Sequence, residues 1–333
     1  MNENKIPSIE RSCRQRAFSF LGKYALLGLA ILLFVIFSVI EPYFSRVSNI
    51  LDIFRTASIY GICSLGLSLV MISGEIDFAC GIEMAMGGVS IALILDSTVF
   101  HSFFLGTLVV LGLAAGFGFV NWFLHCKVGI PAFIATMGTS LFVKGILMGM
   151  TKSARVFSAK WPSNFKTLGS GRLFDIIPYP AIAFLLLSLI MLFYTERTVS
   201  GKKLYAVGSN GSACRYLGID PSREKLKAFM LCAMFSALAG VIHASTNGGA
   251  IYSLGDNALI NGFTILMLGA TFYRIGVYNV PGTIVGAVII SALDNGLTMI
   301  GAGTVEKYLV KGLVMLVAIF TVNMLRKNAA KTK

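Results

Sequence analysis

Charged side chains are scarce in this 333-residue sequence, where Asp, Glu, Lys and Arg together make up 13% of the positions. That is about half the share found in a soluble domain, while apolar residues reach 56% and the mean hydropathy is +0.79. The six cysteines form no C-x-x-C pair, which argues against a disulfide framework or a metal site. The composition predicts a single membrane domain with no appended soluble domain.

Motifs for covalent chemistry are missing as well. No G-x-x-x-x-G-K-[ST] loop, which cradles nucleotide phosphates, occurs in the sequence, so an ATPase that drove this protein would be a separate subunit. The paired aspartates that hold magnesium pyrophosphate in membrane prenyltransferases are absent too, and no serine, histidine and acid cluster suggests a protease. The sequence predicts a protein that is not an enzyme and has no cofactor or metal of its own.

Ten apolar runs approach the length of about 20 residues that a helix needs to cross the hydrocarbon core of a membrane. We therefore expect an all-α polytopic membrane protein with about ten transmembrane helices. The third, eighth and ninth runs are short or interrupted by glycine, which favours positions along a pathway inside the protein. The expected spans are residues 24–40, 56–73, 78–95, 103–124, 130–150, 177–194, 228–245, 260–272, 280–299 and 308–325.

Lysines and arginines set the expected orientation. They gather in segments 1–23, 195–227 and 326–333, and ten spans put all three segments on one side, which the positive-inside rule makes the cytoplasm. The sequence thus predicts one membrane domain over 24–325 that begins with an uncleaved span, flanked by two cytoplasmic tails. Because these segments carry most of the net charge of +13, we expect no nucleic-acid partner.

One basic loop disagrees with this orientation. Segment 151–175 holds five lysines and arginines, yet the order of the spans places it outside. Two interpretations stay open. The segment is either a solvated surface loop or a contact surface for an extracytoplasmic protein with acidic patches, because charge complementarity speeds encounter.

Four ionisable residues fall within the apolar runs: Glu83, Lys144, Asp294 and Lys311. Such residues are functional candidates because charge is costly in hydrocarbon. An ion-coupled secondary transporter could work through Glu83 and Asp294, whereas the two lysines could snorkel or pair with a carboxylate. The scarcity of carboxylates also fits a path for a neutral substrate.

The polar segment 198–221 between two apolar runs is the most informative part of the chain. Ser209 or Asn210 can cap a short helix over 211–217, and Gly218 can end that helix in the left-handed conformation before Pro221. A surface connector explains the polarity but not the apolar and aromatic residues, which favour a docking helix. These residues are Tyr205, Val207, Tyr216, Leu217 and Ile219.

Four stretches, in order, resemble the permeases of ABC importers of the ribose and simple-sugar branch. Residues 201–219 are similar to the pattern G-x-x-x-Y-A-x-G-G-N…A…x-G-I, and residues 74–81 to the loop G-G-I-D-L-S-V-G. Residues 130–138 resemble the span x-P-x-F-I-x-T-L-G, and motifs within 282–312 resemble the C-terminal helices. The resemblance covers residues 51–319, nearly the whole chain.

The resemblance implies a fold like that of type II ABC importer permeases, with a cytoplasmic coupling helix. It implies separate ATPase subunits that bind ATP, an extracytoplasmic sugar-binding protein and a second permease subunit, identical or paralogous, in the inner membrane bilayer. It assigns ATPase coupling to Tyr205, Gly208, Asn210, Ala213, Arg215, Tyr216, Leu217 and Gly218. It assigns the pathway or helix packing to Gly74, Asp77, Gly81, Glu83, Pro131, Phe133, Thr136, Gly138, Gly282, Gly286 and Asn295.

Local roles can be given to some of these residues. Glu75 and Ala79 stand where the family pattern has glycine and serine. We expect Asp77 to cap the third span and to interact with its helix dipole rather than to bind an ion. Gly282 and Gly286 have the small-x-x-x-small spacing that permits close approach of two helices.

Overall fold

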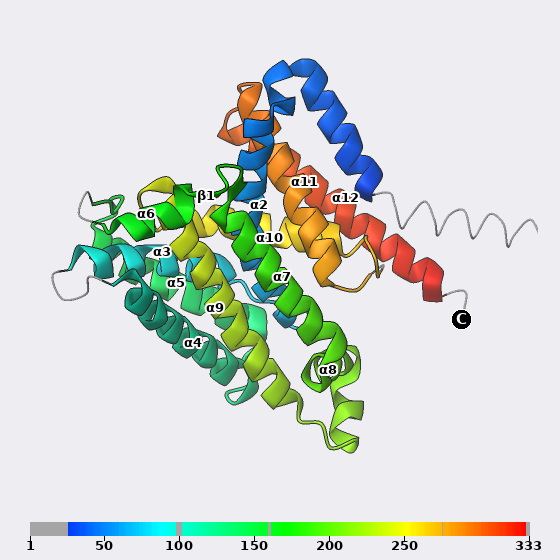
Figure 1. Cartoon of the computed structure of the whole chain (residues 1–333). Helices are drawn as coiled ribbons and strands as arrows, with labels where there is room; N and C mark the ends of the chain where they lie inside the picture. The colour runs from blue at the N-terminus through cyan, green and yellow to red at the C-terminus, as the bar shows by residue number, and fades with distance from the viewer. Residues whose placement is uncertain (1–25, 98–101, 159–160, 275, 331–333) are drawn as a thin grey trace, which may run out of the picture.

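A computed structural model describes residues 26–97, 102–158, 161–274 and 276–330, which form a bundle of helices (Figure 1). The only strands among these residues are two that pair in a short antiparallel ladder. The elements in chain order are a first helix Leu26–Ile40, the 3-10 helix η1 Pro42–Ser45, α2 Val47–Ile72, α3 Cys80–Asp96, α4 Phe103–Cys126, α5 Ala132–Thr151, α6 Ser163–Ser170, β1 Arg172–Leu173, β2 Ile177–Pro178, α7 Tyr179–Arg197, α8 Val199–Tyr216, α9 Pro221–Asn247, α10 Leu254–Gly269, α11 Val280–Met299 and α12 Thr304–Ala330.

Six of the described helices, α2, α4, α5, α7, α9 and α11, are long and apolar enough to cross a membrane. The expected third and eighth spans correspond to α3 and α10, which hold 17 and 16 residues and fall short of the usual length of about 20. The structure therefore supports an all-α polytopic membrane protein, and the count of ten spans stays a prediction. Helix α12 continues to Ala330, so part of the expected tail 326–333 is helical, while segment 1–23 lies outside the described residues.

Helices α2, α3 and α9 form the centre of the bundle. In α2 and α9, 78% and 67% of the most apolar stretch is buried, against 22% in α4 and 17% in α5. Aliphatic and aromatic side chains such as Ile62, Leu65 and Phe229 fill the space between the central helices. The large apolar faces of α4, α5 and α7 point outward, as expected of helices that meet lipid or another protein.

Glycines let the helices of the bundle approach one another at backbone distance. A Cβ atom on Gly240 of α9 would overlap the carbonyl oxygen of Met84 in α3. A Cβ atom on Gly282 of α11 would overlap the carbonyl oxygen of Gly269 in α10, and one on Gly286 would lie 2.5 Å from that of Ile265. The expected close packing of the Gly282 and Gly286 face is therefore confirmed, and this face looks at α10 rather than at lipid.

Two buried aromatic residues anchor the basic segment 151–175 on the bundle, while neighbours such as Ser163 and Lys166 are exposed. Both interpretations of its exposed surface stay predictions. Trp161 and Phe165 are buried and meet edge to face, with ring centroids 5.4 Å apart. The Ser245 hydroxyl of α9 donates a hydrogen bond to the carbonyl oxygen of Phe165. An aromatic pair next to a proline gives no periodic signal in the sequence, which explains why this anchoring was not predicted.

Helix α7 separates the loop from α8. It begins at Tyr179, beside α6 and the β1–β2 ladder, and it ends at Arg197, where α8 follows (Figure 1). Its 19 residues span about 28 Å. Helix α7 is also apolar enough to cross a membrane, and it separates α6 from α8 along the chain. The placement of α6 and α8 on opposite sides of the membrane stays a prediction.

Substituting Gly282 with alanine should destabilise the bundle, because the added methyl group meets the backbone of α10. Overpacking of this kind costs about 1–3 kcal/mol. The matched control is Gly116→Ala on α4, where an added Cβ meets nothing within 4 Å and alanine favours the helix by up to about 1 kcal/mol. Recovery of monodisperse protein after heating in detergent measures both effects. Equal recovery for the two variants would contradict the close α10–α11 contact.

Candidate functional site

Helix α8 consists of two helical segments joined at a kink. The Thr198 hydroxyl accepts a hydrogen bond from the backbone N–H of Gly201 at 3.1 Å and caps the first segment. Asn210 has φ −158° and ψ 90°, and its Oδ1 accepts from the N–H of Ala213 at 3.0 Å. Gly218 follows with φ +73°. The predicted cap and stop are thus confirmed at Asn210 and Gly218, whereas the helical segment before Ser209 was missed.

The first segment of α8 is seated on the end of α2 and on the loop before α11. The hydroxyl of Tyr205 donates to the carbonyl oxygen of Tyr278 at 2.9 Å. Burial, together with the nearby Glu196 carboxylate, raises the pKa of Tyr205 to about 12, so the hydroxyl keeps its proton. A Cβ atom on Gly208 would overlap the carbonyl oxygen of Ile72. Any displacement of α8 must therefore reach α2 directly.

The second segment of α8 projects away from the bundle. Tyr216 is 91% exposed and Leu217 is 78% exposed, and Arg215 and Ala213 are exposed beside them. Cys214 points inward and is buried. An aromatic and an aliphatic side chain held at the tip of a capped helix, next to a cation, are suited to a partner protein.

A charged cluster supports the loop that follows α2. Glu75 forms ion pairs with Lys225 of α9 and with Nε2 of His125 at 3.1 Å, and Nδ1 of His125 lies 3.0 Å from the carbonyl oxygen of Ile130. Burial raises the pKa of the Glu75 carboxyl, but hydrogen bonds from His125 and Lys225 outweigh burial and lower the pKa overall. The residue that departs from the family pattern thus connects the ends of α2, α4 and α9.

A cavity of about 710 Å³ opens between α8 and this loop. Its lining includes Glu75, Tyr205 and Arg274, together with backbone and side chains of the loop before α11. Arg274 is also paired with Glu196 of α7 at 2.7 Å. The cavity therefore lies between α8, the loop after α2 and the loop before α11, and not at the apolar centre of the bundle.

Two of the pathway candidates, Asp77 and Glu83, meet Cys232 of α9 at the centre of the bundle. One ligand atom from each lies within 4.8 Å of the others, and all three side chains are buried. Carboxylates and a thiol are possible metal ligands, so among the described residues this group could hold a cation. Helix α3 begins at Cys80 with Ala79 as its N-cap. Asp77 Oδ1 accepts from the N–H of Ala79 at 2.7 Å, so it closes the preceding turn and is not the cap we expected.

The other pathway candidates do not converge on one cavity. Gly81 packs against the backbone of Gly255 in α10, and Gly74 has φ +88° beside Gly208. The Thr136 hydroxyl accepts from the N–H of Phe78 at 3.0 Å, which connects α5 to the start of α3. The remaining candidates are Pro131 at the N-cap of α5, Phe133 and Gly138 on its exposed side, Gly282 and Gly286 against α10, and half-buried Asn295 on α11.

Both lysines that fall within the apolar runs of the sequence pair with a carboxylate. Lys311 of α12 lies 2.7 Å from Asp294 of α11, and Lys144 of α5 lies 2.8 Å from Asp256 of α10. The sequence predicted that these lysines either snorkel or pair with a carboxylate, but it did not identify Asp256 as the partner of Lys144. The available signal was an aspartate in the first turn of a helix, directly after Gly255.

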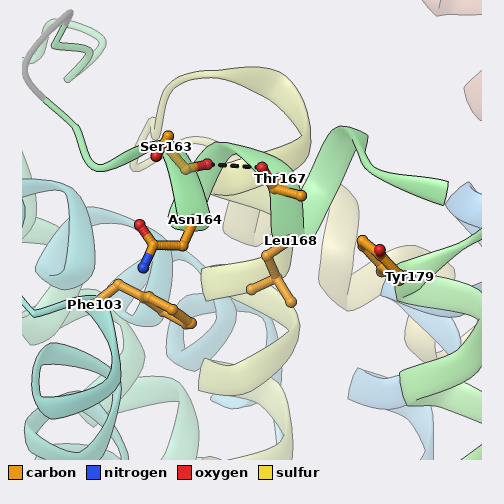
Figure 2. A pocket seen from close by; sticks show the side chains of 6 residues that line it. All are labelled: Phe103, Ser163, Asn164, Thr167, Leu168 and Tyr179. Carbon is orange, nitrogen blue, oxygen red and sulfur yellow. Dashed lines mark hydrogen bonds between the residues drawn. The ribbon is translucent and has the colours of Figure 1, made fainter. Parts of the chain in front are cut away.

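At the opposite end of the bundle from α8, a shallow hollow of about 480 Å³ lies between α6, α4 and α7 (Figure 2). Figure 2 shows Phe103 and Leu168 at its apolar side and Asn164 and Ser163 at its rim, where the Thr167 hydroxyl donates to the carbonyl oxygen of Ser163 at 2.9 Å. The polar rim distinguishes this end of the bundle from the apolar faces of α4 and α5.

Several known proteins are similar to this chain over most of its length. The ribose import permease protein RbsC of Bacillus subtilis (strain 168) is 30% identical over 299 residues, 88% of this chain and 90% of that protein. RbsC of Escherichia coli (strain K12) is 28% identical over 302 residues, 90% and 92% of the two chains. The xylose transport system permease protein XylH of Escherichia coli (strain K12) is 29% identical over 352 aligned positions, 88% of each chain.

No solved structure matches the chain significantly. A family model described as the permease component of branched-chain amino acid transport systems matches residues 49–319. This match extends from the third residue of α2 to the second half of α12 and includes α8 and the buried Asp77 and Glu83. The chain belongs to this family of transport permeases.

Proposed function

We propose that this chain is the membrane-spanning permease subunit of an ATP-driven importer for a simple sugar such as a pentose or hexose. The observation that carries the proposal is the kinked, capped helix α8, whose exposed tip lies between two membrane-crossing helices. Its relatives across nearly the whole chain are ribose and xylose permeases. In this proposal the chain performs no covalent chemistry, and ATP is bound and hydrolysed by separate subunits.

Coupling follows from how α8 is held. An ATPase subunit would dock on Arg215, Tyr216 and Leu217, and its closure would push α8 against Ile72 and Tyr278, the contacts on which α8 is seated. Because these contacts involve backbone atoms, the push passes to α2 and α11 and changes the side from which the pathway is open. This assignment places α8 and both termini in the cytoplasm and the bundle in the inner membrane.

An ion-coupled carrier is less well supported. Such a carrier would work through Glu83 and Asp294, but Asp294 is neutralised by Lys311 at 2.7 Å. Glu83 remains, and it lies in a group with Asp77 and Cys232 that is closed to solvent. The relatives named for ribose and xylose import favour the ATP-driven importer.

Two further partners are part of the proposal. A sugar-binding protein would meet the outer end of the bundle, where α6 and the β1–β2 ladder carry the exposed Lys166 and Phe174. A second permease subunit, identical or paralogous, would cover outward faces of the bundle such as that of α5, which is only 17% buried. Charged residues at the outer end would speed encounter with an acidic partner.

Uptake into vesicles tests the function as a whole. The chain would be reconstituted with the ATPase and the sugar-binding protein that copurify with it, and radiolabelled ribose and xylose would be supplied outside. We expect accumulation of at least one sugar only when ATP and the binding protein are both present. Accumulation driven by a sodium or proton gradient without ATP would instead establish the ion-coupled carrier.

Tyr216→Asp should remove the ATPase from the complex while the permease still reaches the membrane, because a charge replaces an exposed aromatic contact at the tip of α8. Loss of one such contact weakens the binding of the ATPase by about tenfold or more. A tenfold loss of affinity corresponds to about 1.4 kcal/mol of binding free energy. Copurification of the ATPase with the tagged permease measures the loss. Phe174→Asp, an equally exposed aromatic position at the other end (85%), should retain the ATPase. Equal retention in both variants would remove α8 as the docking site.

Single cysteines test the two sides of the membrane. After the native cysteines are replaced, Ser163→Cys on α6 should react with an impermeant thiol reagent added to intact cells, because Ser163 is exposed at the end of the bundle opposite to α8. Ser212→Cys on the second segment of α8 is also exposed but should react only after the cells are opened. The reverse pattern would invert the topology and move the proposed ATPase site outside.

A further inference from the structure

An ion pair lies on an outward face of the bundle at mid-depth. Nζ of Lys144 in α5 is 2.8 Å from both carboxylate oxygens of Asp256, in the first turn of α10. Lys144 lies about 18 Å along α5 from Ala132, in a helix about 30 Å long. The two side chains are 29% and 58% exposed. The pair therefore sits near the middle of a helix that is apolar enough to cross a membrane.

This exposure is incompatible with contact to lipid. A charge facing hydrocarbon costs several kcal/mol, and such residues face a bundle interior or a water-filled cavity instead. The pair between Lys311 and Asp294 obeys the rule by burial, since those side chains are only 8% and 18% exposed. Because the Lys144–Asp256 pair is not buried within the chain, the seam between α5 and α10 faces water, a polar ligand or polar groups of the second permease subunit, and not lipid.

A second polar contact extends this seam to α12. Asn257 follows Asp256 on the exposed side of α10, and its Oδ1 accepts a hydrogen bond from the hydroxyl of Tyr308 at 2.7 Å. Tyr308, on α12, is 39% exposed. The start of α10 thus carries an ion pair toward α5 on one side and an amide–phenol pair toward α12 on the other.

The pair is held in place on one side and open on the other. Gly81 of α3 packs against the backbone of Gly255, the residue before Asp256, which fixes the start of α10. Lys144 is 29% exposed and Asp256 is 58% exposed, so a ligand can reach both side chains. Gly138, Gly145 and Gly149 form a separate row about a third of a turn around α5 from Lys144, where an added Cβ would meet nothing within 4 Å.

We propose that Lys144, Asp256, Asn257 and Tyr308 form a binding site for the hydroxyl groups of the transported sugar, in the wall of the passage through the membrane. This proposal rests on the proposed function and deepens it. Together the four side chains offer ammonium and amide donors, carboxylate and amide acceptors, and one aromatic ring. Since the charges of Lys144 and Asp256 cancel, the site suits a neutral molecule with several hydroxyl groups and not an anion or a cation.

The site is built for weak binding. A hydrogen bond that is exchanged with water contributes only about 0.5–1.5 kcal/mol, and the partners are already paired with one another. Its place near the middle of α5 puts it inside the passage rather than at either mouth. A sugar that reached it from the binding protein would leave it easily, as transport requires.

The test uses the complete importer in vesicles, with ribose as the probe and xylose as the competitor. Asp256→Asn and Tyr308→Phe remove one charge or one hydroxyl with little change in shape. We expect each to lower the rate of ribose uptake at saturating binding protein, by about tenfold for Asp256→Asn, and to change the preference between ribose and xylose. Arg55→Gln is the control, because Arg55 and Asp52 form an ion pair of similar exposure elsewhere, 20% and 49%. It should keep wild-type uptake.

The double variant Lys144→Asp with Asp256→Lys separates a binding site from a structural pair. It can restore the ion pair and with it the thermal stability of the complex, but it exchanges the positions of donor and acceptor. We expect stability to return and ribose uptake to stay low. Full return of uptake, or unchanged uptake and preference in the single variants, would overturn the site. Failure of the wild-type importer to accumulate either sugar would overturn the proposed function itself.

Discussion

Contact between helix backbones at glycine is the constraint on which the bundle depends. In a membrane, apolar side chains gain nothing by leaving lipid for protein, so close packing must supply the stability. Gly240 brings α9 onto α3, Gly282 brings α11 onto α10, and Gly81 brings α3 onto the first turn of α10. The last contact is the one that holds Asp256 within reach of Lys144. A feature that looks like simple packing thus sets the position of polar groups on the far side of α10.

Much of the local structure follows from the sequence. The cap at Asn210, the left-handed Gly218 and the close α10–α11 face were all predictable, because each depends on a residue and its neighbours a few positions away. The anchoring of loop 151–175 by Trp161 and Phe165 was not predictable, because it depends on where Ser245 and its helix come to lie. The count of spans does not follow from the sequence for the same reason, since short helices such as α3 are stabilised by their surroundings rather than by length.

The candidate site shows the same division. Sequence patterns identified the exposed residues of α8 and named Glu83, Lys144, Asp294 and Lys311 as unusual within apolar runs. The sequence patterns could not show which charged residues pair with one another. Lys144 and Asp256, for example, are 112 positions apart, and only the fold brings them together. Glu75 was noticed as a departure from the family pattern, yet its ion pair with Lys225 across 150 positions became visible only in three dimensions. Charged residues that look isolated in the sequence are paired with charges of opposite sign from distant parts of the chain.

The joint between α8 and α2 has a mechanical consequence. A side chain under load can change rotamer and absorb a displacement of an ångström or more, as a spring does. At Gly208 no side chain intervenes between α8 and the carbonyl oxygen of Ile72. This contact therefore has no side chain that could absorb a displacement by changing rotamer. The two helical segments of α8 meet at Asn210, whose backbone is not helical. In the proposed importer, bending at Asn210 would reduce the displacement that an ATPase subunit passes to α2, and the close contact at Gly208 would preserve it.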